Sequence, residues 1–312
     1  MHILLTGGTG YIGAHIANMF LDRKHIVVCF GPIIEDNKLL GRIGNNHLIE
    51  GDILNKLQLN EAIDYIKPDA IIHLAAYGAG TEGLLKSASV YPDKALDVNL
   101  HGFYNVLSAS VEFKVPRVIW SSSSTVYGKA DWYNTQRVDE RADAKPVTFY
   151  GLTKAMSESM AAYFIRNYSS NITGVRLPLI FGPDKWYKGA GNSLVDIFEN
   201  YKYGIETVIK EFDEPFDLMY IKDVAELFYK LTTMKGKGAA LYNVRSFTVT
   251  YAEIVETVKN FLPDHKLEYQ EVMRSDTVVY PLMDTSSIEK DLSYAPDFTL
   301  TEACRDYIEA LV

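Results

Sequence analysis

The sequence predicts an α/β fold, in which a doubly wound parallel sheet with helices on both faces is followed by a smaller C-terminal α/β lobe. Two observations predict it. Short apolar segments alternate with helical segments from the N-terminus to Leu177, and a glycine-rich turn joins the first apolar segment to the first helix. Strands that alternate with helices are joined by right-handed crossovers, and the resulting parallel sheet is covered on both faces.

Each predicted strand is a short apolar run, as is typical of a strand that is buried on both faces. These runs are His2–Thr6, His25–Phe30, His47–Glu50, Ala70–Leu74, Arg117–Ser121 and Thr173–Leu177. Helical patterns predict helices at Tyr11–Asp22, Gln58–Ile66, Tyr91–Phe113 and Thr148–Tyr168, and amphipathic helices further on at Val249–Phe261 and Leu300–Leu311.

The composition limits the partners that the protein can have. The chain has 312 residues and a net charge of −9. An acidic chain is unsuited to nucleic acid or an anionic membrane, so a small-molecule substrate is expected. Cys29 and Cys304 are too few for a disulfide framework, which favours a cytoplasmic protein. No apolar run approaches the ~20 residues of a membrane helix, and the histidines predict no metal site.

The turn after the first predicted strand has the composition of a phosphate-binding loop. Gly7 allows a tight turn, Gly10 lets the backbone approach a pyrophosphate, and Gly13 allows the helix to pack closely on the strand. The helix begins with Tyr11 and Ile12, and its N-terminal amides point toward the phosphates. The segment therefore predicts a dinucleotide site.

A second motif predicts proton transfer. Tyr150 and Lys154 are four residues apart in a predicted helix, so their side chains share one face. An ammonium near a phenol stabilises the phenolate and lowers the pKa of the tyrosine. The tyrosine can then exchange a proton with a substrate hydroxyl or carbonyl while a hydride moves to or from a nicotinamide.

With these motifs, the chain resembles the extended branch of the short-chain dehydrogenase/reductase superfamily, in the UDP-glucose 4-epimerase-like part of the NAD-dependent epimerase/dehydratase family. The resemblance spans nearly the whole chain, and its motifs occur in the family order. The further segments that carry it are His73-Leu74-Ala75-Ala76, Asp97-Val98-Asn99, Ser121 to Gly128, Arg176-Leu177-Pro178, Tyr220 to Ala225 and Asp284-Thr285-Ser286.

The resemblance implies the organisation of the chain. Residues 1–178 form an NAD(P)-binding Rossmann domain, and residues 179–312 form the substrate-binding lobe. A segment near residues 220–248 returns to the Rossmann domain, with one further parallel strand near Tyr242–Val244. The resemblance also implies a homodimer, in which the helices at Tyr91–Phe113 and Thr148–Tyr168 pair across a two-fold axis. Outer apolar positions proposed for this contact are Phe103, Val106, Met160 and Phe164.

The resemblance also implies the site residues. The catalytic set is Ser123, Tyr150 and Lys154, where Ser123 is selected because the acting hydroxyl lies three residues before Val126. The cofactor-binding set is Gly7, Gly10, Tyr11, Ile12, Gly13, Asp52, Ile53, Leu74, Ala75, Ala76, Asn99, Ser121, Tyr150, Lys154 and Pro178. The substrate-binding set is Ser123, Ser124, Thr125, Tyr150, Leu179 and Arg274.

The end of the second predicted strand departs from the family pattern. NAD-preferring members usually carry an Asp there for the adenosine ribose, and Gly31 takes its place. Glu35 or Asp36 could fold back to the ribose. We therefore expect NAD as the cofactor, and NADP stays open.

Two departures concern the substrate. Leu179 replaces an Asn of the sugar-nucleotide enzymes, and Phe216 replaces an Arg that holds the substrate diphosphate, whereas Arg274 matches a second such Arg. Because a charge-assisted contact is lost, a nucleotide-sugar substrate is in question.

Residues near the acting serine narrow the reaction class. Ser124 and Thr125 supply no carboxylate of the kind that dehydratases use, and neither cysteine lies near the motifs. The first hypothesis is an epimerase-like enzyme that acts on a carbinol of a sugar-type substrate. The second is a net alcohol dehydrogenase or ketone reductase for a small non-nucleotide substrate, and the third is a non-catalytic cofactor sensor.

Overall fold

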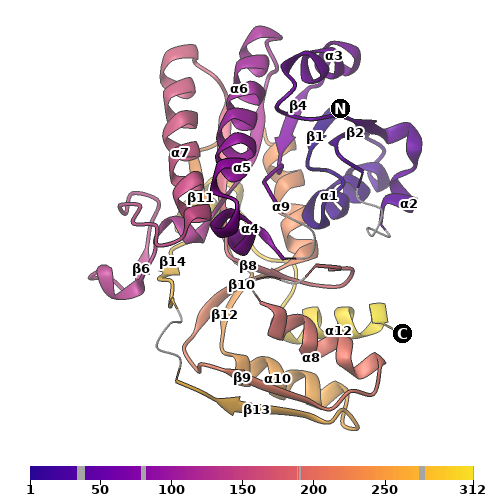
Figure 1. Cartoon of the computed structure of the whole chain (residues 1–312), viewed down its shortest axis with the longest axis vertical. Coiled ribbons are helices and arrows are strands. Elements are labelled where there is room, and N and C mark those ends of the chain that lie inside the picture. The colour runs from indigo at the N-terminus through magenta and orange to yellow at the C-terminus, as the bar shows by residue number, and fades with distance from the viewer. Residues whose placement is uncertain (34–38, 79–81, 188, 190, 274–277, 312) are drawn as a thin grey trace.

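The computed structural model describes residues 1–33, 39–78, 82–187, 189, 191–273 and 278–311. A sheet of seven strands forms its centre, in the order β11-β7-β5-β4-β1-β2-β3, and every neighbouring pair is parallel (Figure 1). The predicted fold class is confirmed. The strands are β1 (His2–Thr6), β2 (Ile26–Gly31), β3 (Leu48–Glu50), β4 (Ala70–His73), β5 (Val118–Ser123), β7 (Ile172–Leu177) and β11 (Leu241–Asn243).

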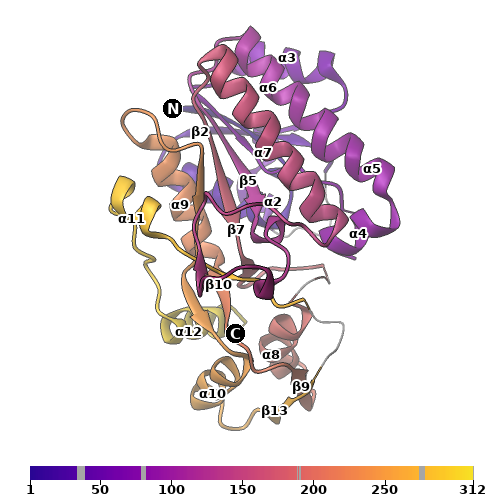
Figure 2. The ribbon, with the colours of Figure 1, turned by 90° about the vertical axis from the view of Figure 1, so that its left-hand side faces the viewer.

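Alternate residues of the strands support two layers of helices, because successive side chains point to opposite faces. Ile3 and Leu5 of β1 belong to the core under α1 and α9, whereas Leu4 belongs to the core under α3, α6 and α7. Figure 2 shows α6 and α7 on one face of the sheet and α9 on the other. These helices are α1 (Tyr11–Asp22), α3 (Lys56–Ile66), α6 (Phe103–Glu112), α7 (Phe149–Tyr168) and α9 (Ile221–Thr233).

The C-terminal lobe lies below the large sheet in Figure 1 and has an apolar core of its own. Its sheet has the order β12-β10-β8, and a separate parallel pair joins β13 to β9. The chain returns from the lobe through α9, which packs on α1, and through β11, which pairs with β7. The lobe contains β8 (Leu179–Phe181), α8 (Asn192–Lys202), β9 (Thr207–Glu211), β10 (Phe216–Tyr220), β12 (Phe247–Val249), α10 (Tyr251–Phe261), β13 (Leu267–Glu271) and α12 (Leu300–Leu311).

Short elements complete the fold. The pair β6–β14 is parallel and packs near the first turns of α7. Short helical turns cover residues 45–47, 124–126 and 130–132. The remaining elements are α2 (Leu40–Ile43), α4 (Leu84–Val90), α5 (Pro92–Leu96), β6 (Arg137–Val138), β14 (Leu282–Met283) and α11 (Ser286–Leu292).

The helix predicted at Tyr91–Phe113 differs from the expectation. It consists of α5, a π-helical turn over Asp97–Gly102 and α6. A π-helical turn inserts an extra residue into the helix, and such turns are frequent at functional sites. The turn places Asn99 in the interior, where 3% of its surface is exposed.

The residues on the outward face of α6 and α7 also differ from those predicted. Phe103 and Val106 are fully buried against the sheet, so they cannot form an outer contact face, and Phe164 is only 5% exposed. The alternation of apolar positions could not separate the inner from the outer face. The structure instead exposes Tyr104 and Tyr163.

Candidate active site

The glycine-rich turn brings the end of β1 against the end of β4. Gly7 has a φ of +72°, and a Cβ there would lie 2.6 Å from the backbone N of Ala75. A Cβ on Gly13 would lie 2.2 Å from the carbonyl O of Gly7. Both positions therefore require glycine.

The first turn of α1 suits a pyrophosphate. Gly10 is its N-cap, and within the described residues no side chain caps the helix. The amides of Tyr11, Ile12 and Gly13 open this helix, where anions are stabilised. A Cβ on Gly10 would meet only the O of Gly7, at 3.2 Å, so the backbone remains accessible there. These features fit a dinucleotide.

The predicted lining residues lie around this turn. Leu74, Ala75 and Ala76 follow β4, and the Leu74 amide donates to Thr6 O at 2.9 Å. Ser121 lies in the neighbouring strand β5. Pro178 directly follows Leu177, which pairs with Ser123 in the sheet. All of them lie at the carboxyl ends of the strands, the edge at which such sheets bind ligands.

The adenine and ribose positions are described in part. Ile53 is buried, and Asp52 is exposed and accepts from the Leu54 amide at 2.9 Å. At the end of β2, Thr9 Oγ1 donates to Pro32 O at 2.7 Å, next to Gly31. Glu35 and Asp36, the candidates for the ribose, lie outside the described residues.

The three predicted catalytic residues lie where β5 meets α7. Ser123 ends β5, and Tyr150 and Lys154 are in the first two turns of α7; their exposed fractions are 8%, 7% and 3%. Lys154 Nζ lies 5.6 Å from the centre of the Tyr150 ring and donates to Ser121 O at 2.8 Å. Ser123 Oγ accepts from Thr125 N and Thr125 Oγ1, at 3.2 and 3.0 Å.

Burial controls the charge states in this site. It raises the pKa of Tyr150 above its ordinary value, and the neighbouring phenol of Tyr187 adds to the rise. Burial also lowers the pKa of Lys154 to about 8, while the Glu158 carboxylate opposes it. We expected a lowered pKa for Tyr150. The direction is reversed because desolvation of the phenolate outweighs an ammonium that bonds to Ser121 O.

Asn99 links three segments of the site. Its Oδ1 accepts from the Tyr77 amide at 2.8 Å, and its Nδ2 donates to Thr153 Oγ1 at 3.0 Å. Thr153 Oγ1 donates in turn to Tyr150 O at 2.8 Å. Asn99 therefore holds the segment after β4 against the first turn of α7.

The predicted substrate residues differ in how deeply they are buried. Thr125 is buried, whereas Ser124 and Leu179 are half-buried. Phe216 packs on the ring of Tyr251, 4.9 Å away, and so joins the core of the lobe. Arg274 lies outside the described residues.

The sequence analysis did not identify an aromatic segment that packs against the start of α1, next to the glycine-rich turn that is proposed to bind the cofactor (the cofactor turn). The rings of Trp186 and Tyr187 lie 6.3 and 6.2 Å from the ring of Tyr11. Lys185 Nζ lies 5.1 Å from the Tyr187 ring, and burial lowers the pKa of Lys185 to about 8. The only sequence signal is a Lys-Trp-Tyr run after a Gly-Pro turn, and it has no characteristic spacing.

The described residues hold no cluster of three or more histidine, cysteine, aspartate or glutamate side chains that could bind a metal. No helix in the same part of the chain is both long and apolar enough to span a membrane.

A family model and several curated proteins match this chain. A model of the NAD dependent epimerase/dehydratase family matches residues 3–244. A putative UDP-glucose 4-epimerase of Methanocaldococcus jannaschii is 27% identical over 309 residues, covering 97% of this chain and 96% of that protein. A probable UDP-glucuronate 4-epimerase of Rhizobium meliloti is 27% identical over 248 residues, covering 74% and 68%.

Solved structures share the fold. The Thermus thermophilus UDP-glucose 4-epimerase in complex with NAD has a TM-score of 0.83 at 20% identity, and covers 100% of this chain and 99% of that one. The L-threonine dehydrogenase of Clostridium difficile has a TM-score of 0.82 at 21% identity, with coverages of 99% and 97%. At these identities the likeness concerns the fold alone.

Acid should destabilise the protein through His73. Its Nδ1 lies 2.7 Å from Thr6 Oγ1 and its ring stacks on Phe103 at 4.9 Å, and burial lowers its pKa to about 3, with a further contribution from Lys154. Below the unfolded-state pKa of about 6.5, only the unfolded chain binds this proton, so stability falls with pH until the folded pKa is reached. From pH 7 to pH 5 the free energy of unfolding should fall in both proteins. The fall should be about 2 kcal/mol smaller in His73→Asn than in the parent.

Urea titrations at the two pH values measure this. His101→Asn is the control, because the His101 side chain is 76% exposed. Equal losses in His73→Asn and in the parent would contradict the assignment.

Proposed function

Because this chain belongs to the NAD-dependent epimerase/dehydratase family, we propose that it oxidises or reduces a carbinol of a sugar-type substrate, with Ser123, Tyr150 and Lys154 as its catalytic residues. Membership of the family confirms the predicted relationship, the enzyme class and NAD as cofactor. The observation that carries the proposal is the hydrogen bond from Lys154 Nζ to Ser121 O, which joins the first turns of α7, where Tyr150 and Lys154 lie, to the strand that ends at Ser123.

Each residue has a distinct part in the proposed chemistry. When bound, NAD supplies the hydride acceptor or donor for the reacting carbon. Tyr150 exchanges a proton with the substrate oxygen through its phenol. Ser123 Oγ already accepts two hydrogen bonds from Thr125, so its own proton can be donated to the same oxygen. Lys154 uses one donor on Ser121 O and has two others for the cofactor ribose.

Two reaction types fit this site. Transient oxidation, as in 4-epimerisation, is supported by the relatives named UDP-glucose and UDP-glucuronate 4-epimerases. Net dehydrogenation of a small substrate is the second candidate, because Leu179 and Phe216 stand where the sugar-nucleotide enzymes carry polar groups. We favour epimerisation. We further propose a cytoplasmic enzyme, in which the buried thiols of Cys29 and Cys304 stay reduced.

Tyr150→Phe should reduce turnover by about a hundredfold or more, because the transferable proton is lost. Cofactor affinity should hardly change. Lys154→Ala should reduce both, since the lysine also serves the cofactor. Steady-state rates and calorimetric titration with NAD measure the two effects. A Tyr150→Phe enzyme with near-parental turnover would remove Tyr150 from its role.

The parent should bind UDP weakly, because Phe216 occupies the position of a diphosphate-binding arginine and packs on Tyr251. Phe216→Arg should tighten UDP binding roughly tenfold, the effect of one charge-assisted hydrogen bond. Phe212→Arg, within the same aromatic cluster, is the control. Tight UDP binding by the parent would instead support a nucleotide-sugar enzyme with other anion contacts.

We also propose a homodimer, formed through α6 and α7. A groove on these helices is lined by Tyr104, Ser108, Val111, Met160, Tyr163, Phe164 and Tyr168. Tyr104, Tyr163 and Tyr168 are about half exposed, at 49%, 51% and 51%. Exposed aromatic residues that gather on one face are typical of interfaces.

Light scattering at micromolar concentration should give the mass of a dimer. Tyr163→Asp should shift the protein toward monomer, because a charge would be buried at the contact. Tyr65→Asp on α3 is the matched control, since Tyr65 is 83% exposed. A monomer mass for the parent would refute the dimer.

A further inference from the structure

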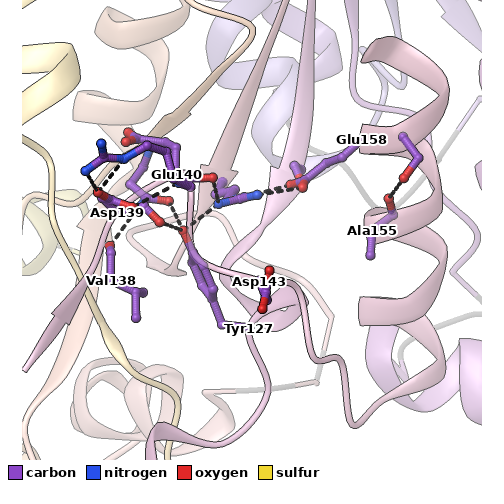
Figure 3. A network of polar contacts seen from close by, with 12 residues as sticks. Tyr127, Val138, Asp139, Glu140, Asp143, Ala155 and Glu158 are labelled. Atoms are coloured by element: carbon purple, nitrogen blue, oxygen red, sulfur yellow. Dashed lines mark hydrogen bonds and ion pairs between the residues drawn. The ribbon is translucent and has the colours of Figure 1, made fainter. Parts of the chain in front are cut away.

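A buried carboxylate lies behind the catalytic helix. Glu158 is on α7, one helical turn after Lys154, and its side chain is 9% exposed. Its Oε1 accepts from Ser122 Oγ at 2.6 Å and from Arg176 Nε at 2.8 Å, and its Oε2 accepts from Arg176 Nη2 at 2.7 Å. Figure 3 shows Glu158 on the side of α7 that faces this network.

The arginine of this pair is enclosed by oxygen atoms. Its side chain is 4% exposed, and Nη1 donates to the Tyr127 hydroxyl and, at 3.2 Å, to Glu140 O. The Tyr127 hydroxyl donates to Asn243 Oδ1 at 2.8 Å. Removing two charges from water is costly, and a buried pair is a weak source of stability. Stability alone therefore explains this buried pair poorly, and a role in the adjacent site explains it better.

The network meets the catalytic residues through consecutive residues of β5. Ser121 O accepts from Lys154 Nζ, Ser122 Oγ donates to Glu158, and Ser123 is the proposed catalytic serine. Ser122 is also the partner of Arg176 in the pairing of β5 with β7. Lys154 and Glu158 thus attach one face of α7 to neighbouring positions of β5.

We propose that Glu158 is a positioning residue, which holds α7 to β5 at Ser122 and places a carboxylate, shared with Arg176, one helical turn from the buried ammonium of Lys154. This inference rests on the proposed function, in which Lys154 acts as a cation. No contact of Glu158 with substrate or cofactor is part of it.

The surroundings of Lys154 support this role. On its own helix it faces Tyr150; from β5 it faces the Trp120 ring, 6.0 Å away, and Ser121 O; from β4 it faces His73. Burial keeps Tyr150 and His73 neutral near pH 7, since it raises the pKa of the phenol and lowers the pKa of the imidazole to about 3. Glu158, whose carboxylate also pairs with Arg176 of β7, raises the pKa of Lys154 against the effect of burial, which lowers it to about 8.

The test removes both charges while keeping an acceptor for Ser122. In Glu158→Gln/Arg176→Met, neither member of the ion pair is left as an unpaired buried charge, so the fold should persist. If the loss of the carboxylate outweighs the loss of the guanidinium and lowers the pKa of Lys154 by about one, the protonated fraction of Lys154, and with it NAD affinity, should be nearly unchanged at pH 6.5 and roughly eightfold lower at pH 8.5. Calorimetric titration with NAD at the two pH values measures this, after near-ultraviolet circular dichroism has established native packing.

A second variant, a single substitution, separates the effect of the carboxylate charge from the effect of side-chain length. Glu158→Asp keeps the charge beside Arg176 but shortens the side chain, so the pH dependence of NAD affinity should stay parental while turnover falls. Glu226→Gln is the matched control, because Glu226 on α9 also pairs with an arginine, Arg23 at the end of α1. It should leave both quantities unchanged.

The outcomes separate a failure of the proposed function from a failure of the role proposed for Glu158. If Lys154→Ala alters neither NAD affinity nor turnover, the proposed function fails. If Lys154→Ala alters them but Glu158→Gln/Arg176→Met follows the parental pH profile, the role of Glu158 alone is overturned. An unfolded double variant together with a parental Glu158→Asp would also overturn it, because the pair would then serve only the fold.

Discussion

The site depends on a close backbone contact between the turn after β1 and the segment after β4. A Cβ on Gly7 would lie 2.6 Å from Ala75 N, and one on Gly13 would lie 2.2 Å from Gly7 O. No side chain fits at either position, so the cofactor turn rests directly on the neighbouring chain and on α1. Because β1 and β4 are adjacent in the sheet, this contact lies at the point where the strand order reverses. Ser123, the proposed catalytic serine, ends β5, the next strand.

Desolvation is the second constraint, and it changes the expected chemistry. The phenol of Tyr150 and the ammonium of Lys154 are both buried, and burial disfavours the charged form of each. The protein therefore holds a neutral phenol beside an easily deprotonated lysine. The Lys154 ammonium lies 5.6 Å from the centre of the Tyr150 ring, so its attraction for a phenolate is smaller than the cost of burying that charge. A bound substrate and cofactor would change the solvation of both groups, so the charge states of catalysis belong to the loaded enzyme.

The sequence predicted features that depend on local chemistry and on spacing. The parallel sheet followed from apolar runs, the shared face of Tyr150 and Lys154 followed from a helical spacing, and Ser123 was implied by the family resemblance. The sequence could not predict which side chains of α6 face away from the sheet. Phe103 and Tyr104 are both aromatic, so their residue types alone do not show which of them packs on the sheet. The pairing of Glu158 with Ser122 and Arg176 joins three elements far apart in the chain, and no spacing encodes it. The direction of the Tyr150 pKa was missed for the same reason, since burial is a property of the packed molecule.

The division into two lobes is less complete in the structure than in the sequence. Tyr11 opens α1, yet its ring belongs to the apolar core of the C-terminal lobe and meets Trp186 and Tyr187. Tyr187 also adds to the rise that burial gives to the pKa of Tyr150. The aromatic segment thus contacts the first residue of α1 on one side and influences the phenol of Tyr150, the proposed catalytic tyrosine, on the other. Any movement of the lobe relative to the large sheet would have to separate these rings, so access to the cofactor turn and the environment of Tyr150 are physically coupled.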